Sequence, residues 1–448
     1  MDLPPGPRAP AAWQTVAWTA RPAAFLRRVH ARFGDPATIR TFWTPEPMVL
    51  VSDPDAVRDV FRLDPTIAPA GQSWEFVRPF AGEHSILVLD GEEHLRERRL
   101  LQGPFHGERM RALAPLVGEL AARELDGWEG RVVTLERMRA LTLEVILRVV
   151  FGARGDAEVR ELRDAVEGTL GMVRSLPTML SMALVQRDLG PWSPWGRFRA
   201  AVERFDALLL DVVARRRAEA GGDSVLALLL EQRTEDGAPV DDRHLRDQLV
   251  ALLVGGHDTS AASLAWMFER LARHPEVHER GREGDPRYAE AVVKESLRVR
   301  PSLTIAPRLL LEPARIGRRM IPAGVQVAAC LWLAMRRDDL WEDAGAFRPE
   351  RWLEEGAPAH PTSWIPFGGG VRRCAGAPFA EMEMREVLRA SAGLALRPVR
   401  PEPERSRRSA LVVTPHRGGE VVVIRRGAGG RPGAGGRPRA ASTTPTVP

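Results

Sequence analysis

A short glycine-rich stretch around one cysteine constrains this chain more than any other feature. Residues 367–376 read Phe-Gly-Gly-Gly-Val-Arg-Arg-Cys-Ala-Gly. Glycines allow tight backbone turns and a close approach to a flat partner. Pro378 then opens an apolar and acidic run that is typical of a helix with proline near its first position. We therefore predict that Cys374 lies buried at a helix N-terminus, where N–H groups, the helix dipole and two arginines hold it as a thiolate.

The spacing of this stretch suggests a use for the thiolate. A cysteine beside a flexible loop could also be a buried structural residue. The pattern Phe-Gly-x-Gly-x-Arg-x-Cys-x-Gly resembles the haem-ligand loop of the cytochromes P450. That resemblance implies haem b as cofactor, with Cys374 as the ligand of the iron. The other loop residues that it assigns to haem contacts are Phe367, Gly368, Gly370, Arg372 and Gly376.

The longest helical period runs from about residue 241 to residue 273, which corresponds to a helix of roughly 45–50 Å. Its middle, Gly-Gly-His-Asp-Thr-Ser at 255–260, consists of poor helix formers. A structural kink would explain this, but the segment also resembles the oxygen-binding stretch of P450s. The resemblance implies that Gly255 and Gly256 make room for porphyrin and O2, and that Thr259 opens the helical ladder locally. Asp258 would relay protons; the alternative is that it pairs with a surface arginine.

Two more elements resemble contacts to the haem propionates. His94 and Arg98 are four residues apart, so they share one face of a helix. Such a face is often merely solvated, but His-x-x-x-Arg in P450s binds propionates, for which the planar arginine fork is well suited. Arg308 matches the second propionate arginine of the family.

A charged motif further along the chain is predicted to be structural. Glu295 and Arg298 are three residues apart on a helix, and Arg351 follows in Phe-Arg-Pro-Glu-Arg-Trp. On a solvated surface such a pair contributes little, whereas a buried pair needs full pairing. The resemblance implies a buried triad that locks the cysteine loop in place.

The apolar segments are expected to enclose a hydrophobic substrate. Residues 64–90 form a long irregular stretch with several large apolar side chains, expected to roof the pocket, and residues 175–195 match the mobile lid of the family. The predicted pocket residues are Ile86, Leu87, Leu252, Leu303, Thr304 and Ile305. A fatty acid, terpenoid, steroid or polyketide would suit such a lining.

Composition limits the cellular context. Two cysteines, Cys330 and Cys374, allow no disulfide framework, and no run of 18 apolar residues provides a membrane anchor. A cytoplasmic protein that binds no nucleic acid is expected, because no basic tract interleaved with aromatics accompanies the net charge of +5. We predict a monomer with one domain over residues 1–426 and a disordered Gly/Pro/Arg-rich tail over 427–448.

The resemblance as a whole predicts a mainly α fold with a smaller β-rich lobe, the triangular prism of the cytochromes P450. It implies monooxygenation, such as hydroxylation in secondary metabolism, with one oxygen atom of O2 entering the substrate and the other leaving as water. Electrons would come from NAD(P)H through a separate ferredoxin or flavodoxin-type protein, docking on a basic patch of Arg96, Arg99, Arg372 and Arg373. The alternatives are a peroxide-driven peroxygenase, which would lack the acid–threonine pair, and a non-catalytic haem-thiolate sensor, which a regulatory fusion domain would favour.

Overall fold

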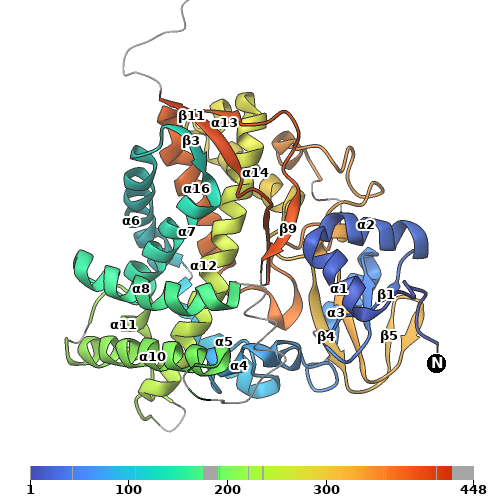
Figure 1. The fold of residues 1–448 in the computed structure, drawn as a ribbon, viewed down its shortest axis with the longest axis horizontal. Helices are drawn as coiled ribbons and strands as arrows, with labels where there is room; N and C mark the ends of the chain where they lie inside the picture. The colour runs from blue at the N-terminus through green and yellow to red at the C-terminus, as the bar shows by residue number, and fades with distance from the viewer. Residues whose placement is uncertain are drawn as a thin grey trace, which may run out of the picture.

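Helices dominate the computed structural model, which describes residues 2–425 except 43, 106, 175–189, 191, 220, 235–236, 357, 359 and 410. The predicted lid at 175–195 falls largely outside the described residues, and the predicted tail at 427–448 falls wholly outside them. Figure 1 shows the helices gathered on one side and the N-terminal helices beside the largest sheet on the other. No helix of the described part is long and apolar enough to span a membrane.

The helices have the following bounds. In the first half they are α1 (Ala11–Ala20), α2 (Pro22–Phe33), α3 (Pro54–Arg62), α4 (Arg78–Ala81), α5 (Gly91–Gln102), α6 (Gly107–Asp126), α7 (Thr134–Val145), α8 (Gly155–Arg174) and α10 (Pro194–Glu219). In the second half they are α11 (Val225–Leu230), α12 (Asp242–Arg273), α13 (Pro275–Gly281), α14 (Pro286–Val299), α15 (Leu331–Ala334) and α16 (Ala377–Ala390). Short 3-10 or π turns are η1 (Gly71–Val77), η2 (Gly103–Phe105), η3 (Ile146–Val150), η4 (Pro349–Trp352), η5 (Gly370–Arg372) and η6 (Ser391–Gly393).

The strands form four small sheets. The largest has the order β1 (Ala37–Ile39), β2 (Met48–Val51), β7 (Val325–Ala329), β4 (Ala306–Leu310), with β2 and β7 parallel and the other pairs antiparallel. A second sheet has the order β3 (Gly130–Val133), β11 (Glu420–Arg425), β8 (Leu394–Pro398). Two hairpins are β5 (Ala314–Ile316) with β6 (Arg319–Ile321), and β9 (Ser406–Ser409) with β10 (Val412–Pro415). Each of the two larger sheets therefore pairs strands that lie far apart in the sequence.

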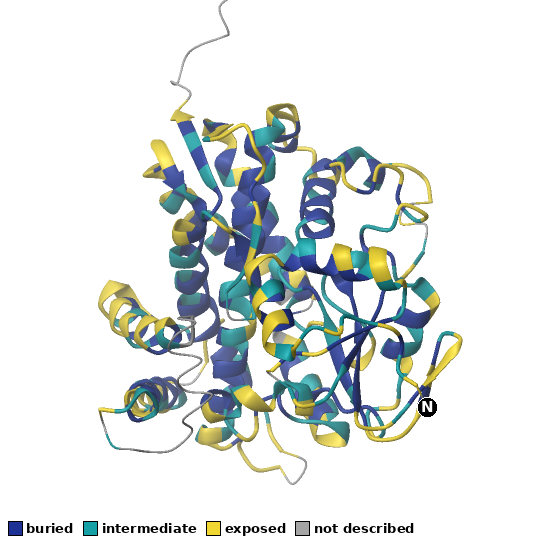
Figure 2. Cartoon of the chain, turned by 45° about the vertical axis from the view of Figure 1, so that its right-hand side comes forward, coloured by how far each residue is buried: buried dark blue, intermediate teal, exposed yellow. Residues whose placement is uncertain are grey.

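Helix α12 runs through the middle of the helical side (Figure 1) and is buried along most of its length (Figure 2). Its start is fixed by Asp241, whose carboxylate accepts the N–H groups of Arg243 (2.9 Å) and His244 (3.3 Å), and Pro275 follows its end. The bounds agree with the predicted 241–273 segment. The predicted opening of the helical ladder at Thr259 is wrong, because α12 continues unbroken from Asp242 to Arg273.

Three apolar clusters make up the core. The largest joins α6, α7, α8, α10, α12, α14 and α16. A second packs α3 against β2, β4 and β7 of the largest sheet, and a third packs α1 and α2 against the other face of the same sheet. Cys330 is fully buried in this third cluster. The segments that carry the candidate site residues, α5, α12, β4 and the cysteine loop, lie where the helical side and this sheet meet.

Candidate active site

The cysteine loop leads directly into α16, whose first residue, Ala377, follows Gly376. The N–H of Cys374 donates to the carbonyl of Phe367 at 2.9 Å, which closes the loop. Gly368 and Gly370 have φ values of +68° and +65°, a region in which side chains with a Cβ are strained. The sequence therefore places glycine where this backbone requires it, with the sulfur at the N-terminus of a helix.

The predicted thiolate is not the state that the protein alone favours. The Cys374 side chain is open to solvent, not buried, yet neighbouring protein atoms crowd it on most sides. This partial burial raises the pKa of the thiol above its usual value, and it outweighs the N–H groups of Gly376 and Ala377 and the charges of Arg98 and Arg373, which lower that pKa. Desolvation is therefore the larger effect on Cys374 in the protein by itself, and the thiolate stays a prediction for the site with haem bound.

A group of basic side chains from three separate segments converges beside this loop. His94 and Arg98 come from α5, Arg308 from β4 and Arg372 from η5. His94 is buried, and burial together with the charges of Arg372, Arg98 and Arg308 lowers its pKa to about 3. Burial and the charge of Arg372 likewise lower the pKa of Arg308 to about 10. Mutual repulsion of this kind indicates a site that awaits negative charge.

One member of this basic group already has an acidic partner. Arg372 pairs with Asp90 at 2.5 Å, and it also donates to the carbonyls of Ile86 and Leu89. The expectation that Arg372 is free for a propionate is therefore not met, because the guanidinium ties the cysteine loop to the loop before α5. In contrast, the guanidinium of Arg98 donates to the carbonyl of Arg373 at 2.6 Å, and that of Arg308 to the carbonyl of Pro307 at 2.7 Å.

The two glycines of α12 have different surroundings. Gly255 is exposed in the middle of an otherwise buried helix, and a Cβ built there would meet no atom within 4 Å. A Cβ on Gly256 would lie 3.2 Å from Cδ1 of Ile146, at the packing contact with η3. Gly255 thus faces open space as predicted, whereas a side chain at position 256 would press on Ile146; the role of Gly256 in making room for porphyrin stays a prediction.

The acid and the hydroxyl next to these glycines are both engaged. The hydroxyl of Thr259 donates to the carbonyl of Gly255 at 2.5 Å, one turn earlier in α12. Asp258 forms an ion pair with Arg139 of α7 at 3.1 Å, and both side chains are partly exposed. The pairing with an arginine, which the sequence left as an alternative for Asp258, is therefore present. Arg139 lies at a distance of 119 residues in the sequence, so no local pattern indicates it.

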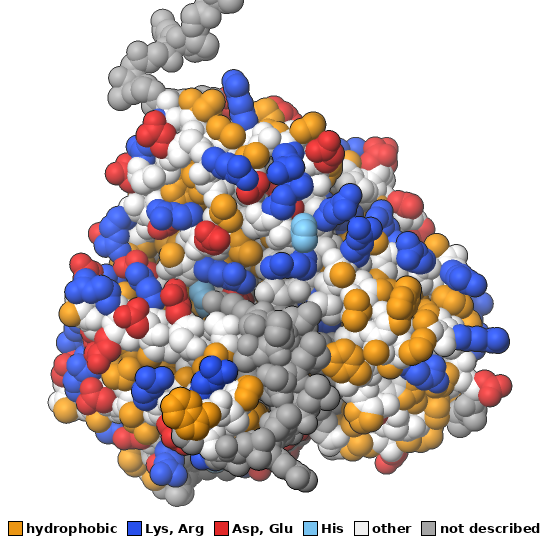
Figure 3. Space-filling view, in the orientation of Figure 1, with side chains coloured by type: hydrophobic (Ala, Val, Ile, Leu, Met, Phe, Trp, Pro, Cys, Tyr) orange, Lys and Arg blue, Asp and Glu red, His pale blue; other side chains and the backbone are white. Residues whose placement is uncertain are grey.

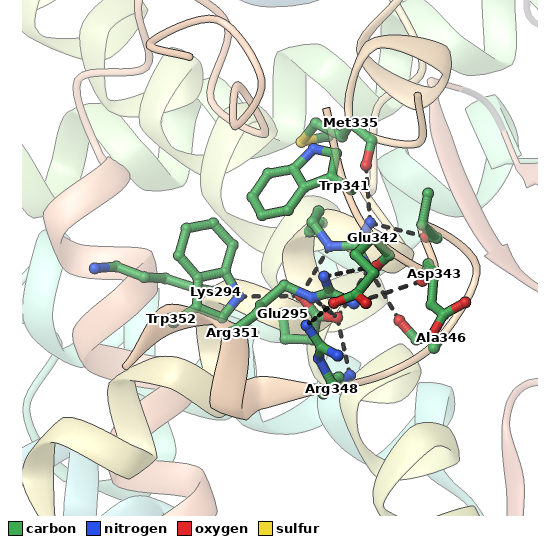
Figure 4. Close-up of polar contacts among 12 residues, drawn as sticks. Lys294, Glu295, Met335, Trp341, Glu342, Asp343, Ala346, Arg348, Arg351 and Trp352 are labelled. Atoms are coloured by element: carbon green, nitrogen blue, oxygen red, sulfur yellow. Dashed lines mark hydrogen bonds and ion pairs between the residues drawn. The ribbon is translucent and has the colours of Figure 1, made fainter. Parts of the chain in front are cut away.

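Glu295, Arg298 and Arg351 meet in the interior, where Figure 4 shows Glu295 beside Arg351, Arg348 and Trp352. Both oxygens of Glu295 accept from Arg298 at 2.8 Å, and Oε1 also accepts from Nε of Arg351 at 3.1 Å. Glu295 and Arg298 are fully buried. The indole N–H of Trp352 and the backbone N–H of Arg348 complete the shell at 3.0 and 2.9 Å. Although burial opposes ionisation, the two arginines and these donors keep the pKa of Glu295 below its usual value.

The predicted pocket residues lie in different parts of the structure. Ile86 and Leu252 lie at the edge of the largest apolar cluster, and Leu303 lies at the edge of the cluster under the sheet. Leu87 is partly exposed. Thr304 is buried, and its carbonyl accepts the N–H of Trp332 at 3.4 Å. Ile305 packs against the cluster of α1 and α2, on the other side of the sheet.

A polar network fixes the roof loop before α5 onto α12. His244 of α12 contacts Oε2 of Glu97 of α5 at 2.7 Å, and its ring stacks on that of His84 at 4.9 Å. The side chain of Gln248 also bonds Glu97, at 2.7 Å. The hydrogen bond that the Glu97 carboxylate accepts from His244 raises the pKa of His244 above its usual value, although burial acts in the opposite direction.

Sequence reasoning missed Phe61 of α3. A Cβ on Gly370 would lie 2.1 Å from the carbonyl oxygen of Phe61, and a Cβ on Gly369 would lie 2.3 Å from its ring. These glycines therefore make room for the end of α3. For Gly370, the sequence had instead predicted a close approach to the cofactor. Phe61 and Phe367 also line a groove of about 500 Å³ on this side of the loop. Nothing in the local sequence around Phe61 signals this contact.

Comparison with known proteins gives a consistent result. The model of the cytochrome P450 family matches residues 4–390. Cytochrome P450 135B1 of Mycobacterium tuberculosis is 36% identical over 439 residues, which cover 94% of this chain and 92% of the relative. Cytochrome P450 138 of the same species is 34% identical over 437 residues, which cover 95% and 97%.

Solved structures agree in fold. The retinoic acid-bound cyanobacterial CYP120A1 superposes with a TM-score of 0.80 at 21% identity, covering 95% of this chain and 100% of that one. The haem domain of cytochrome P450DA gives a TM-score of 0.80 at 21% identity, covering 94% and 97%.

Proposed function

The chain belongs to the cytochrome P450 family and is a haem-thiolate monooxygenase, and we propose that Cys374 is the residue that ligates the haem iron. The observation that carries this proposal is the open Cys374 side chain at the N-terminus of α16, beside a converging basic group. A coordinated thiol is deprotonated outright, so the raised pKa of Cys374 does not oppose ligation. When bound, haem supplies the iron at which O2 is activated, and a thiolate ligand favours O–O cleavage.

The residues around Cys374 fit such a group. Haem carries two propionates, and His94, Arg98 and Arg308 bring cationic or donor groups to one place. Among the described residues, no carboxylate forms an ion pair with any of these three side chains. Gly255 supplies the open space on the α12 side. We assign Arg98 and Arg308 to the propionates and leave Arg372 with Asp90, because that guanidinium already has a carboxylate partner at 2.5 Å.

Thr259 and Asp258 are proposed to manage protons at the open face of α12. The Thr259 hydroxyl lies within hydrogen-bond distance of the Gly255 carbonyl, which is the exposed point of the helix. By rotating, a hydroxyl can exchange that bond for one to water or substrate. Asp258 is partly exposed and held by Arg139, so it can pass a proton between solvent and the helix when this pair opens.

The substrate is proposed to be a hydrophobic small molecule. The supporting observation is the apolar character of the partly buried residues Ile86, Leu87, Leu252 and Leu303 near the junction of the two sides. Fatty acids, terpenoids, steroids and polyketides share this chemistry. The relative CYP120A1 was solved with retinoic acid, which is itself an apolar chain with one carboxylate.

Electrons are proposed to arrive from NAD(P)H through a separate acidic ferredoxin or flavodoxin-type protein. The groove next to the cysteine loop combines apolar residues such as Phe61 with Arg58, Arg62 and Arg373. A basic rim around an apolar centre suits an acidic partner. Reduction should slow as salt rises, and Arg58→Gln with Arg62→Gln should flatten that dependence, whereas the exposed Arg319→Gln on β6 should not.

The ligand assignment is tested by the spectrum of the reduced CO complex of the purified protein. Wild type should show the strongly red-shifted Soret band of thiolate ligation, and Cys374→His should keep haem but lose that shift. Cys330→Ala is the matched control, because Cys330 is fully buried in the third apolar cluster. Retention of the thiolate band in Cys374→His would overturn the assignment.

A further inference from the structure

Two guanidinium groups converge on a single carbonyl oxygen in the seam between the two sides of the molecule. Arg300 is the C-cap of α14 and Arg336 follows α15. Nη1 of Arg300 donates to the carbonyl of Val299 at 3.3 Å, and Nη2 of Arg336 donates to the same oxygen. The guanidinium carbons also lie over indole rings, 4.9 Å from Trp266 and 4.8 Å from Trp332. The positions of both cations are thus well defined.

Neither guanidinium has an acidic partner in the described part of the chain. The Nε atoms of both Arg300 and Arg336 are buried and lack any hydrogen-bond acceptor. Buried donors without acceptors are uncommon in native structures, and charged ones are costly. The carbonyl that they share is one neutral acceptor at the C-terminal end of α14, where the helix dipole favours positive charge only weakly. Capping of α14 therefore explains one N–H group of each guanidinium, and it does not explain their other N–H groups.

The surroundings add positive charge. Burial lowers the pKa of Arg300 to about 10, and the charges of Arg270 and Arg27 act in the same direction, while Glu269 opposes them. The pKa of Arg336 lies well below its usual value because of burial and the charge of Arg300. Such shifts mean that each cation is desolvated by burial and, to a smaller extent, repelled by its neighbours.

Glu269, the acid whose charge acts on Arg300, is already committed. Its oxygens accept Nε of Arg270 at 2.6 Å and Nε of Arg273 at 2.7 Å, and also the backbone N–H of Glu404 at 3.2 Å. A carboxylate that bridges two arginines has little capacity left for a third. Arg27 on α2 is exposed, and its charge acts on both Arg300 and Arg336. Figure 3 shows Lys and Arg side chains gathered across the middle of the face that includes α2 and β9.

We propose that the seam formed by Arg300, Arg336 and Arg27 binds a small oxyanion, a phosphate or a carboxylate. Two guanidinium forks that donate to one carbonyl oxygen can grip the paired oxygens of such a group with their remaining N–H donors. The indole rings of Trp266 and Trp332 hold the forks in place, so little rotamer freedom is lost on binding. This site is independent of the haem chemistry proposed above, since α14, α15 and α2 supply it without using the cysteine loop.

The test is calorimetric titration of the haem-loaded wild-type protein with inorganic phosphate, pyrophosphate and citrate, at an ionic strength held constant with sodium chloride. Saturable binding of one equivalent is expected, and the three titrants distinguish phosphate from carboxylate preference. Arg336→Gln should weaken binding by about tenfold or more, since it removes one of the two forks. Arg336→Lys keeps the charge but loses the fork, so it should recover binding only in part.

Two further variants keep the result interpretable if Arg336→Gln is unstable. Arg27→Gln changes an exposed residue and should weaken binding without affecting folding. Arg319→Gln, an exposed arginine on β6, is the matched control and should bind as wild type does. Binding should also raise the melting temperature by about 2 °C for each tenfold rise in anion above its Kd.

The proposal fails if wild type shows no saturable binding of any of the three anions in the millimolar range. It also fails if Arg319→Gln weakens binding as much as Arg336→Gln does, since that result would indicate unspecific attraction to a basic surface. In either case the pair would act only as a cap of α14, and Arg336→Gln should then lower the melting temperature equally with and without anion.

Discussion

Replacing Glu295 by alanine removes one carboxylate that five N–H groups share. These are Nε and Nη2 of Arg298, Nε of Arg351, the indole N–H of Trp352 and the backbone N–H of Arg348. The carboxylate and Arg298 are fully buried, and Arg351 is nearly so. Water therefore cannot replace the lost acceptor without opening the structure.

The size of the effect follows from the buried arginines. Removing one partner of a buried ion pair costs about 3–5 kcal/mol, because the remaining charge stays desolvated. Arg298 would keep its bonds to the carbonyls of Met335, Ala344 and Ala346 at 2.9–3.0 Å, so it stays in place as an unpaired cation. An N–H left without acceptor costs about 1–3 kcal/mol, but these penalties overlap. We expect a total loss of about 3–5 kcal/mol.

This is a large part of the 5–15 kcal/mol that separates folded from unfolded domains. Since η4 and the segment that leads to the cysteine loop depend on these bonds, Glu295→Ala should also fail to retain haem. Glu295→Gln keeps the size and one acceptor, so it should be intermediate. The matched control is Glu290→Gln on the same helix, whose exposed ion pair with Lys294 at 2.6 Å should contribute less than about 1 kcal/mol.

The assay combines thermal unfolding followed by circular dichroism with the ratio of haem to protein after purification. For Glu295→Ala we expect a melting temperature about 5 °C or more below that of wild type, together with a reduced haem ratio. Values equal to those of wild type, or a loss no larger than that of Glu290→Gln, would refute the assignment of Glu295 as the anchor of this network.

Three other predictions use the same preparations. Thr259→Ala should still oxidise reduced nicotinamide through its partners but release hydrogen peroxide in place of product, and an unchanged ratio of product to peroxide would exclude the proton role. His244 has a raised pKa in the folded protein. Its stabilising contact with Glu97 is therefore fully present below about pH 6.5 and is lost as pH rises through the folded pKa. The difference in melting temperature between wild type and His244→Gln should shrink from pH 6 to pH 9. Gly370→Ala should lower the stability by about 1–3 kcal/mol and lower the haem ratio, because the φ of +65° is strained for alanine and the new Cβ would lie 2.1 Å from the carbonyl oxygen of Phe61. Gly393→Ala is the control and should change little, since a Cβ there meets nothing within 4 Å.

Several features of this protein could be predicted from local sequence because they depend on neighbouring residues. The α12 bounds follow from an aspartate cap and a terminal proline, and the observed helix differs from the predicted one by one residue. The cysteine at the start of α16 and the Glu295–Arg298 pair are likewise set by spacings of a few residues. Motif spacing also led to the family, which the comparisons confirm.

The contacts that the sequence did not identify join residues that lie far apart in the chain. Arg372 reaches Asp90 across 282 residues, and Asp258 reaches Arg139 across 119. Gly256 packs on Ile146, and Gly370 accommodates Phe61. No short pattern encodes such contacts, since each depends on how whole helices pack against one another.

The sequence by itself therefore determined the elements, the cysteine loop and the family. Only the tertiary structure decided the electrostatics, because a pKa depends on burial and on every charge nearby, whatever its position in the chain. Cys374 shows this most clearly: its neighbours in sequence favour a thiolate, but burial raises the pKa of the thiol. The convergence of Arg300 and Arg336 on one carbonyl is of the same kind, since two segments that are remote in sequence meet only when the helices and the sheet have packed.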